Sequence, residues 1–114
     1  MIHHVPKFEQ SGWSDDATLT MLCPQCGGNN LHQYTVHTFQ RMEDGDKVVH
    51  TTAYMDGSEV KLVSNQQTNN PSSRRHGLTI EFECENCHWD VASDSFKLDI
   101  WQHKGTTYMV WRTE

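Results

Sequence analysis

The chain has 114 residues, which is near the common size of one domain, and only 35% of them are hydrophobic, so its core must be small. Its formal net charge is -6 with His neutral, and this charge repels phosphate at long range, which disfavours broad nucleic-acid binding. The start MIHHVPKFEQSGWSDD lacks the apolar run of a secretory signal, and no stretch is apolar enough to span a bilayer. We therefore expect a cytoplasmic protein with reduced thiols and no membrane partner.

The first part of the chain is polar and rich in residues that break regular structure. Residues 1–20 include Pro6, Gly12 and two consecutive aspartates at 15–16. We expect an irregular leader over 1–20, followed by a single domain over 21–114.

The rest of the chain is typical of short strands separated by turns. Leu78, Ile80 and Phe82 alternate with polar residues, which is the period of a half-buried strand. Residues 64–77, SNQQTNNPSSRRHG, form a polar loop, and residues 103–105 are expected to turn a C-terminal β-hairpin. The expected strands are 19–22, 31–39, 47–54, 60–63, 78–83, 96–101 and 106–112. No segment has a helical period, so the predicted fold is mainly β, a small antiparallel sheet.

All four cysteines occur in two C-x-x-C pairs, Cys23/Cys26 and Cys84/Cys87. A tight C-x-x-C turn places both sulfurs on one side of the backbone, and two such turns complete the four tetrahedral ligands that Zn²⁺ prefers. The sequence thus predicts a zinc ribbon in which two knuckles hold one structural Zn²⁺. Such a closed site leaves no position for a coordinated water, so the metal stabilises the fold and performs no hydrolysis.

Other readings of the cysteines carry less weight. Two disulfides suit a secreted protein, and a redox-active pair usually opens a helix, which is not expected here. Iron is a minor variant in the same four-sulfur geometry. Cys84-Glu85-Asn86-Cys87-His88 also matches the C-x-x-C-H pattern of c-type haem attachment. That chemistry would normally require export and would leave Cys23 and Cys26 without a role.

The eight histidines do not form a recognised catalytic or metal motif. No H-x-x-x-H or H-E-x-x-H pattern, phosphate-binding glycine loop or nucleophile elbow is present. The favoured interpretation is that the histidines are surface polar groups, with a second metal site as the less favoured one. We expect no enzymatic activity.

Two surfaces are candidates for binding a partner. Arg74 and Arg75 end the polar loop and could bind phosphate or carboxylate. The alternative is a solvated loop end, or arginines that pair with Glu81, Glu83 and Glu85. In the C-terminal hairpin, Trp101, Met109 and Trp111 are expected to share the face away from Phe96, Leu98 and Ile100. Such a cluster is typical of a protein interface, unless the polar loop folds over it.

Several segments are similar to a known group of proteins. They are CPQCGGNNLHQ at 23–33, VHTFQRMED at 36–44, NNPSSRRHGLTIEFECENC at 69–87 and QHKGTTYMVW at 102–111. With these segments the chain resembles small, mostly uncharacterised zinc-ribbon proteins of bacteriophages, prophages and integrative mobile elements of Gram-positive bacteria. His88 departs from the pattern, because such ribbons often carry Gly at this place.

The resemblance implies a mobile-element origin but no settled activity. By analogy with small phage proteins of this size, we expect a function exerted by binding a host protein. Its most specific form is inhibition of a CRISPR effector or another defence nuclease, to which an acidic surface is suited because it can block a nucleic-acid channel. The alternative is a nucleic-acid-binding ribbon that uses Arg74, Arg75 and Lys61 as an accessory to transcription or DNA processing.

Overall fold

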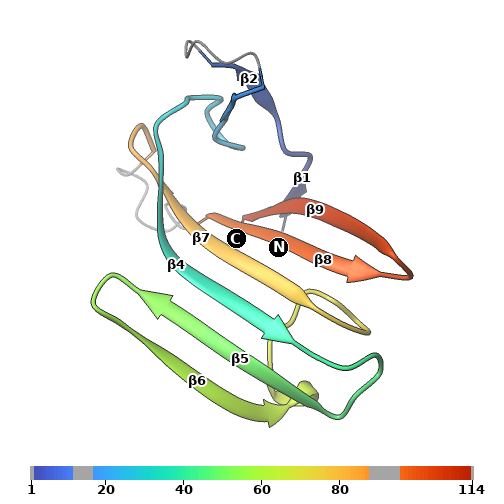
Figure 1. Cartoon of the computed structure of the whole chain (residues 1–114). Helices are drawn as coiled ribbons and strands as arrows, with labels where there is room; N and C mark the ends of the chain where they lie inside the picture. The colour runs from blue at the N-terminus through green and yellow to red at the C-terminus, as the bar shows by residue number, and fades with distance from the viewer. Residues whose placement is uncertain (1, 12–16, 88–95, 114) are drawn as a thin grey trace.

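The computed structural model of the chain describes residues 2–11, 17–87 and 96–113. Within these ranges the protein consists of antiparallel strands and one short 3-10 helix, η1, with no α-helix (Figure 1). The strands are β1 Ile2–His4, β2 Phe8–Gln10, β3 Leu19–Met21, β4 Leu31–Gln40, β5 Lys47–Tyr54, β6 Gly57–Ser64, β7 Gly77–Cys84, β8 Phe96–His103 and β9 Thr106–Thr113, with η1 at Asn65–Gln67. The prediction of a mainly β, antiparallel fold with a C-terminal hairpin is confirmed.

Seven strands form one twisted sheet in the order β1-β9-β8-β7-β4-β5-β6, and β2 and β3 form a separate ribbon beside one end of it (Figure 1). The prediction of an irregular leader over 1–20 is wrong for the described part of that segment. β1 pairs with β9, and β2 pairs with β3. These three-residue strands escape sequence analysis because their order comes from pairing with distant strands and not from a local apolar period.

The sheet has two faces of different character. One face carries the core, in which Phe82, Phe96, Leu98 and Trp111 are buried together with three of the cysteines. The ring of Trp111 meets that of Phe82 edge-on, with centroids 5.2 Å apart. Three of the four cysteines in the two C-x-x-C turns are therefore part of the hydrophobic core.

The other face is polar along its middle. Side chains alternate between faces along a strand, so His37, His50, Thr52, Thr79 and Asp99 share this face. Thr79 donates to Asp99, and Arg112 pairs with the same carboxylate at 2.9 Å, with both charged side chains mostly buried. This face thus carries a row of polar side chains across β5, β4, β7 and β8.

The expected aromatic surface on the C-terminal hairpin is wrong in part. Trp111 is fully buried and lies opposite Leu98, whereas Trp101 lies opposite Tyr108 on the other face and stacks on it, with ring centroids 5.5 Å apart. Met109 is exposed but shares the face of Trp111. The reason is the turn: only Lys104 and Gly105 connect the strands, and a two-residue turn pairs them one residue out of step with a three-residue turn.

The described part of the chain contains no helix that is both long and apolar enough to cross a membrane.

The polar segment between β6 and β7 is ordered by internal hydrogen bonds. Asn70 Oδ1 accepts from the Ser72 N–H at 3.0 Å, and its Nδ2 donates to the carbonyl of Arg75 at 3.0 Å. An added Cβ at Gly77 would collide with Asn70 and Pro71, so this close contact of loop and strand requires glycine.

Candidate metal centre

The cysteines come from two distant turns that the sheet brings together. Cys23 and Cys26 follow β3, while Cys84 ends β7 and Cys87 lies three residues beyond it. Leu31 of β4 pairs with Cys84, and the Glu85 N–H donates to the carbonyl of Asn30 at 3.0 Å. The pairing of β4 with β7 therefore sets the distance between the two knuckles.

The geometry of the four sulfurs fits one tetrahedral ion. All four Sγ atoms lie within 4.8 Å of one another, and the cross-knuckle distances are 3.9 Å for Cys23–Cys87 and 3.6 Å for Cys26–Cys84. A tetrahedron with metal–sulfur bonds of 2.3 Å has edges of about 3.8 Å. These distances exclude disulfides, which need sulfurs about 2.05 Å apart, and all four cysteines are free. The cluster could hold a metal ion.

The backbone of the first knuckle supports the thiolates. The Gln25 N–H donates to Cys23 Sγ and the Gly28 N–H to Cys26 Sγ, both at 3.4 Å. Gly27 has φ 77°, a conformation that favours glycine, and a Cβ at Gly28 would collide with the side chain of Asn86. The sequence Cys-Pro-Gln-Cys-Gly-Gly is thus matched to a turn whose amide groups face the sulfurs.

The electrostatics of the cluster favour a bound cation. The hydrogen bond from Gly28 lowers the pKa of the Cys26 thiol to about 7. Burial raises the pKa of the Cys84 and Cys87 thiols, because a thiolate loses its hydration in the core. Three of the four cysteines are buried, so the negative charge of a deprotonated cluster needs a positive ion within it.

His88, the last residue of the haem-like pattern, lies outside the described residues.

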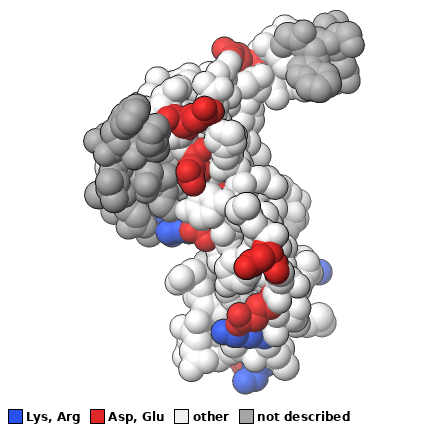
Figure 2. Space-filling view, turned by 90° about the vertical axis from the view of Figure 1, so that its left-hand side faces the viewer, with Lys and Arg blue, Asp and Glu red and all other residues white. Residues whose placement is uncertain are grey.

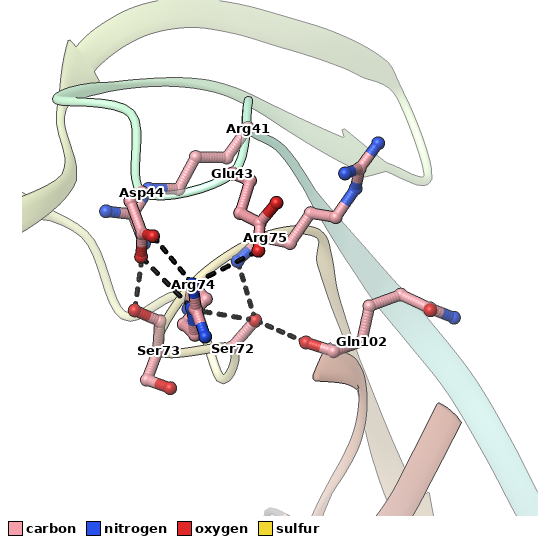
Figure 3. A network of polar contacts seen from close by, with 8 residues as sticks. All are labelled: Arg41, Glu43, Asp44, Ser72, Ser73, Arg74, Arg75 and Gln102. Carbon is pink, nitrogen blue, oxygen red and sulfur yellow. Dashed lines mark hydrogen bonds and ion pairs between the residues drawn. The ribbon is translucent and has the colours of Figure 1, made fainter. Parts of the chain in front are cut away.

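Of the two predicted arginines, Arg74 is held in ion pairs. Arg74 pairs with Asp44 at 2.8 Å and with Glu43 at 3.1 Å (Figure 3). Arg41 donates to the carbonyls of Gly45 and Ser73. The guanidinium beside Asp44 lowers the pKa of that carboxyl group. Arg74 therefore ties the polar loop to the turn after β4, and its partners are not the glutamates of β7.

Ser72 organises the backbone of the same loop. Its hydroxyl donates to the carbonyl of Gln102 at 2.7 Å and accepts from the N–H groups of Arg74 and Arg75 (Figure 3). The Arg75 side chain is directed away from this network and is exposed (Figure 3). Within the described ranges, no hydrogen bond or ion pair engages its guanidinium group.

Arg75 lies at the rim of a groove of about 690 Å³ at the end of the sheet away from the cysteines. The groove is lined by residues that include Leu78, Ile100 and Trp101 and the cations Arg75 and Lys104. Leu78 and Ile100 pair with each other and face one side of the sheet, whereas the Trp101 side chain faces the other side. Trp101 and Arg75, from the two predicted surfaces, are both among the residues at the groove. The sequence did not predict this groove, since it forms between segments whose pairing the sequence does not reveal.

The fold and the cluster define a mainly β protein with a four-cysteine candidate metal centre. No protein-family model, curated protein or solved structure matches the chain.

Proposed function

We propose that the protein is a non-enzymatic zinc ribbon in which Cys23, Cys26, Cys84 and Cys87 hold one structural Zn²⁺. The sulfur–sulfur distances near 3.8 Å and the burial of three thiols in the core support this assignment. Zinc is favoured over iron because a closed four-cysteine site of two knuckles is its commonest structural setting.

The observation that carries the function is the groove between the polar loop and the C-terminal hairpin. Apolar residues, together with an arginine that has no carboxylate partner among the described residues, are features that protein interfaces favour. The Ser72 and Arg74 contacts fix the loop that bears Arg75, so the groove is preformed and little ordering is needed on binding. The proposed activity is therefore binding of a host protein segment in this groove.

The resemblance to proteins of phages and mobile elements makes a defence nuclease the most specific candidate partner, and a CRISPR effector the first to test. Figure 2 shows acidic side chains spread along one side of the molecule. A surface of this sign competes with nucleic acid for a basic channel. In this proposal the groove holds the partner while the acidic side blocks its channel.

Nucleic-acid binding is the alternative function. It is less favoured because two of the three cations expected to bind phosphate are paired with carboxylates. Arg74 is paired with two carboxylates, and Lys61 pairs with Glu59 at 2.7 Å on β6. Arg75 alone of the three predicted cations is left without a carboxylate partner among the described residues. Binding of nucleic acid would reveal itself in a gel shift that weakens steeply with salt.

The test is affinity capture from lysate of a Gram-positive host, with a purified CRISPR effector as the directed arm. We expect the wild type to retain a partner and a Trp101→Ala/Arg75→Glu variant to lose it. Tyr54→Ala/Lys61→Glu is the matched control, since both side chains are exposed and lie outside the groove. Equal capture by wild type and groove variant would refute groove binding, and a salt-sensitive gel shift without a protein partner would favour the alternative.

A further inference from the structure

Two histidines that form no sequence motif meet on the polar face of the sheet. His37 lies on β4, and His50 and Thr52 lie on β5. His37 pairs with Thr52 and Phe39 pairs with His50, which places the two imidazoles diagonally across adjacent strands. The strand register therefore brings these side chains together.

The three donor atoms form a nearly equilateral triangle. His37 Nδ1 is 3.2 Å from His50 Nε2, and Thr52 Oγ1 is 3.4 Å from the first atom and 3.3 Å from the second. A tetrahedral ion with ligand bonds of about 2.0–2.1 Å has donor–donor edges of about 3.3 Å. The triangle thus has the dimensions of one face of a tetrahedral coordination shell, with the fourth position left to water or another ligand.

A carboxylate orients the first imidazole. Glu81 Oε2 on β7 lies 2.7 Å from His37 Nε2, with both side chains mostly buried. The carboxylate accepts the Nε2–H, so His37 Nδ1 carries a lone pair directed at His50 and Thr52. A carboxylate behind a metal-binding histidine fixes the tautomer and raises the basicity of the ligand nitrogen.

The second imidazole is also held in place. The ring of His50 stacks on that of the buried Phe39, with centroids 4.5 Å apart. Burial lowers the pKa of His50, and the nearby His37 and Lys61 lower it further. Lys61 itself pairs with Glu59 at 2.7 Å, which offsets its repulsion of a cation.

A small cavity gives access to the triangle. It has a volume of about 240 Å³ and is lined by His37, His50 and Thr52 together with Tyr54, Glu59 and Lys61. Along β4, His37 is six residues from Leu31, which pairs with Cys84, so the triangle is about 20 Å from the cysteine cluster. The two sites cannot share an ion.

We propose that His37, His50 and Thr52 form a second metal site, which binds a divalent transition-metal ion that prefers imidazole nitrogen, with Glu81 orienting His37. Two imidazoles and a hydroxyl give a site that is open and weaker than the cysteine centre. The competing account is a simple hydrogen bond in which His50 Nε2–H donates to His37 Nδ1, with no metal.

The experiment uses folded protein that already contains its tightly bound ion, and the probe is Zn²⁺ added in an isothermal titration. We expect one further equivalent to bind, with at least a tenfold loss of affinity in His37→Gln and in His50→Gln. Glu81→Gln should weaken binding by about tenfold, the lower end for loss of an orienting partner. His32→Gln is the matched control, because His32 also lies on β4 and faces a carboxylate, Glu85 at 3.0 Å, and no second imidazole pairs with it among the described residues.

A second measurement on the wild type does not depend on the folding of any variant. Nitrogen-15 NMR of the imidazoles should show His37 Nδ1 and His50 Nε2 shifting together as the second equivalent of Zn²⁺ binds. Absence of a second equivalent, equal binding by wild type and His50→Gln, or shifts at the other histidines alone would overturn the proposal and leave a hydrogen-bonded pair.

Discussion

The charge state of His50 depends on groups from three strands. Its imidazole is desolvated, and it faces His37 on β4 and Lys61 on β6, while Glu59 acts in the opposite direction. Together, desolvation and these neighbouring charges lower the pKa of His50 below its ordinary value of 6.5. The residue is therefore neutral in the folded protein at a pH where it is already protonated in the unfolded chain.

This difference makes stability depend on pH in a defined direction. Above pH 6.5 His50 is neutral in both states, and as the pH falls below 6.5 the unfolded chain takes up a proton first, so the free energy of unfolding decreases until the folded-state pKa is reached. We expect proton NMR to give a His50 pKa below 6.5. Denaturant melts at pH 7.5 and 5.5 should show a smaller loss of stability for His50→Gln than for the wild type. Equal losses would mean that the pKa of His50 does not differ between the two states.

Residue chemistry explains which parts of the site the sequence could predict. The four cysteines were predictable because C-x-x-C spacing itself determines a local turn, and the cluster lies where two such turns meet. His37, His50 and Thr52 have no such spacing. Their position depends on the register of the β4–β5 hairpin, which places His37 opposite Thr52 and His50 opposite Phe39.

At the scale of elements, turn length decides which side chains form a surface. Strands β5, β7 and β8 were predictable from alternation, but alternation alone does not say which face of β9 joins which face of β8. The turn of two residues, Lys104 and Gly105, buries Trp111 beside Leu98 and leaves Trp101 on the opposite face. One more residue in this turn would have placed Met109 and Trp111 on the same face as Trp101.

The same turn is not optimal for stability. Lys104 has φ 51° and Gly105 has φ 79°, the left-handed pair that a two-residue hairpin turn requires and that Asn-Gly adopts most readily. We expect Lys104→Asn to raise the free energy of unfolding by about 0.5–1 kcal/mol, measured by denaturant melts. Gly105→Ala is the opposing control: its Cβ would meet no atom within 4 Å, so the expected loss of about 1 kcal/mol comes from the backbone alone. A neutral result for both changes would show that the turn has a different conformation.

At the scale of the whole molecule, the metal centre and the hydrophobic core are one structure. Cys23, Cys84 and Cys87 are buried in the same cluster as the main apolar side chains, Phe82, Phe96, Leu98 and Trp111. Structural zinc contributes on the order of 10 kcal/mol to the folding of small zinc peptides, while whole domains are stable by about 5–15 kcal/mol. In the proposed zinc ribbon, loss of the ion would thus remove free energy comparable to the total stability and leave unpaired thiols in the core.

Removal of the metal should therefore unfold the protein. Elemental mass spectrometry of the protein, purified without added metal, is expected to find one zinc per chain at the cysteine centre, and a strong chelator should abolish the cooperative thermal transition. Cys84→Ser should behave like the chelated protein, because Cys84 is fully buried at the contact between β4 and β7. At pH 7.5, where His50 is neutral in both the folded and the unfolded state, chelator should abolish the thermal transition of His50→Gln as it does that of the wild type, which assigns the unfolding to the cysteines and not to the second site. Iron with visible absorption, or a thermal transition that survives complete metal removal, would refute a structural zinc centre, because a core that folds without the ion does not depend on it.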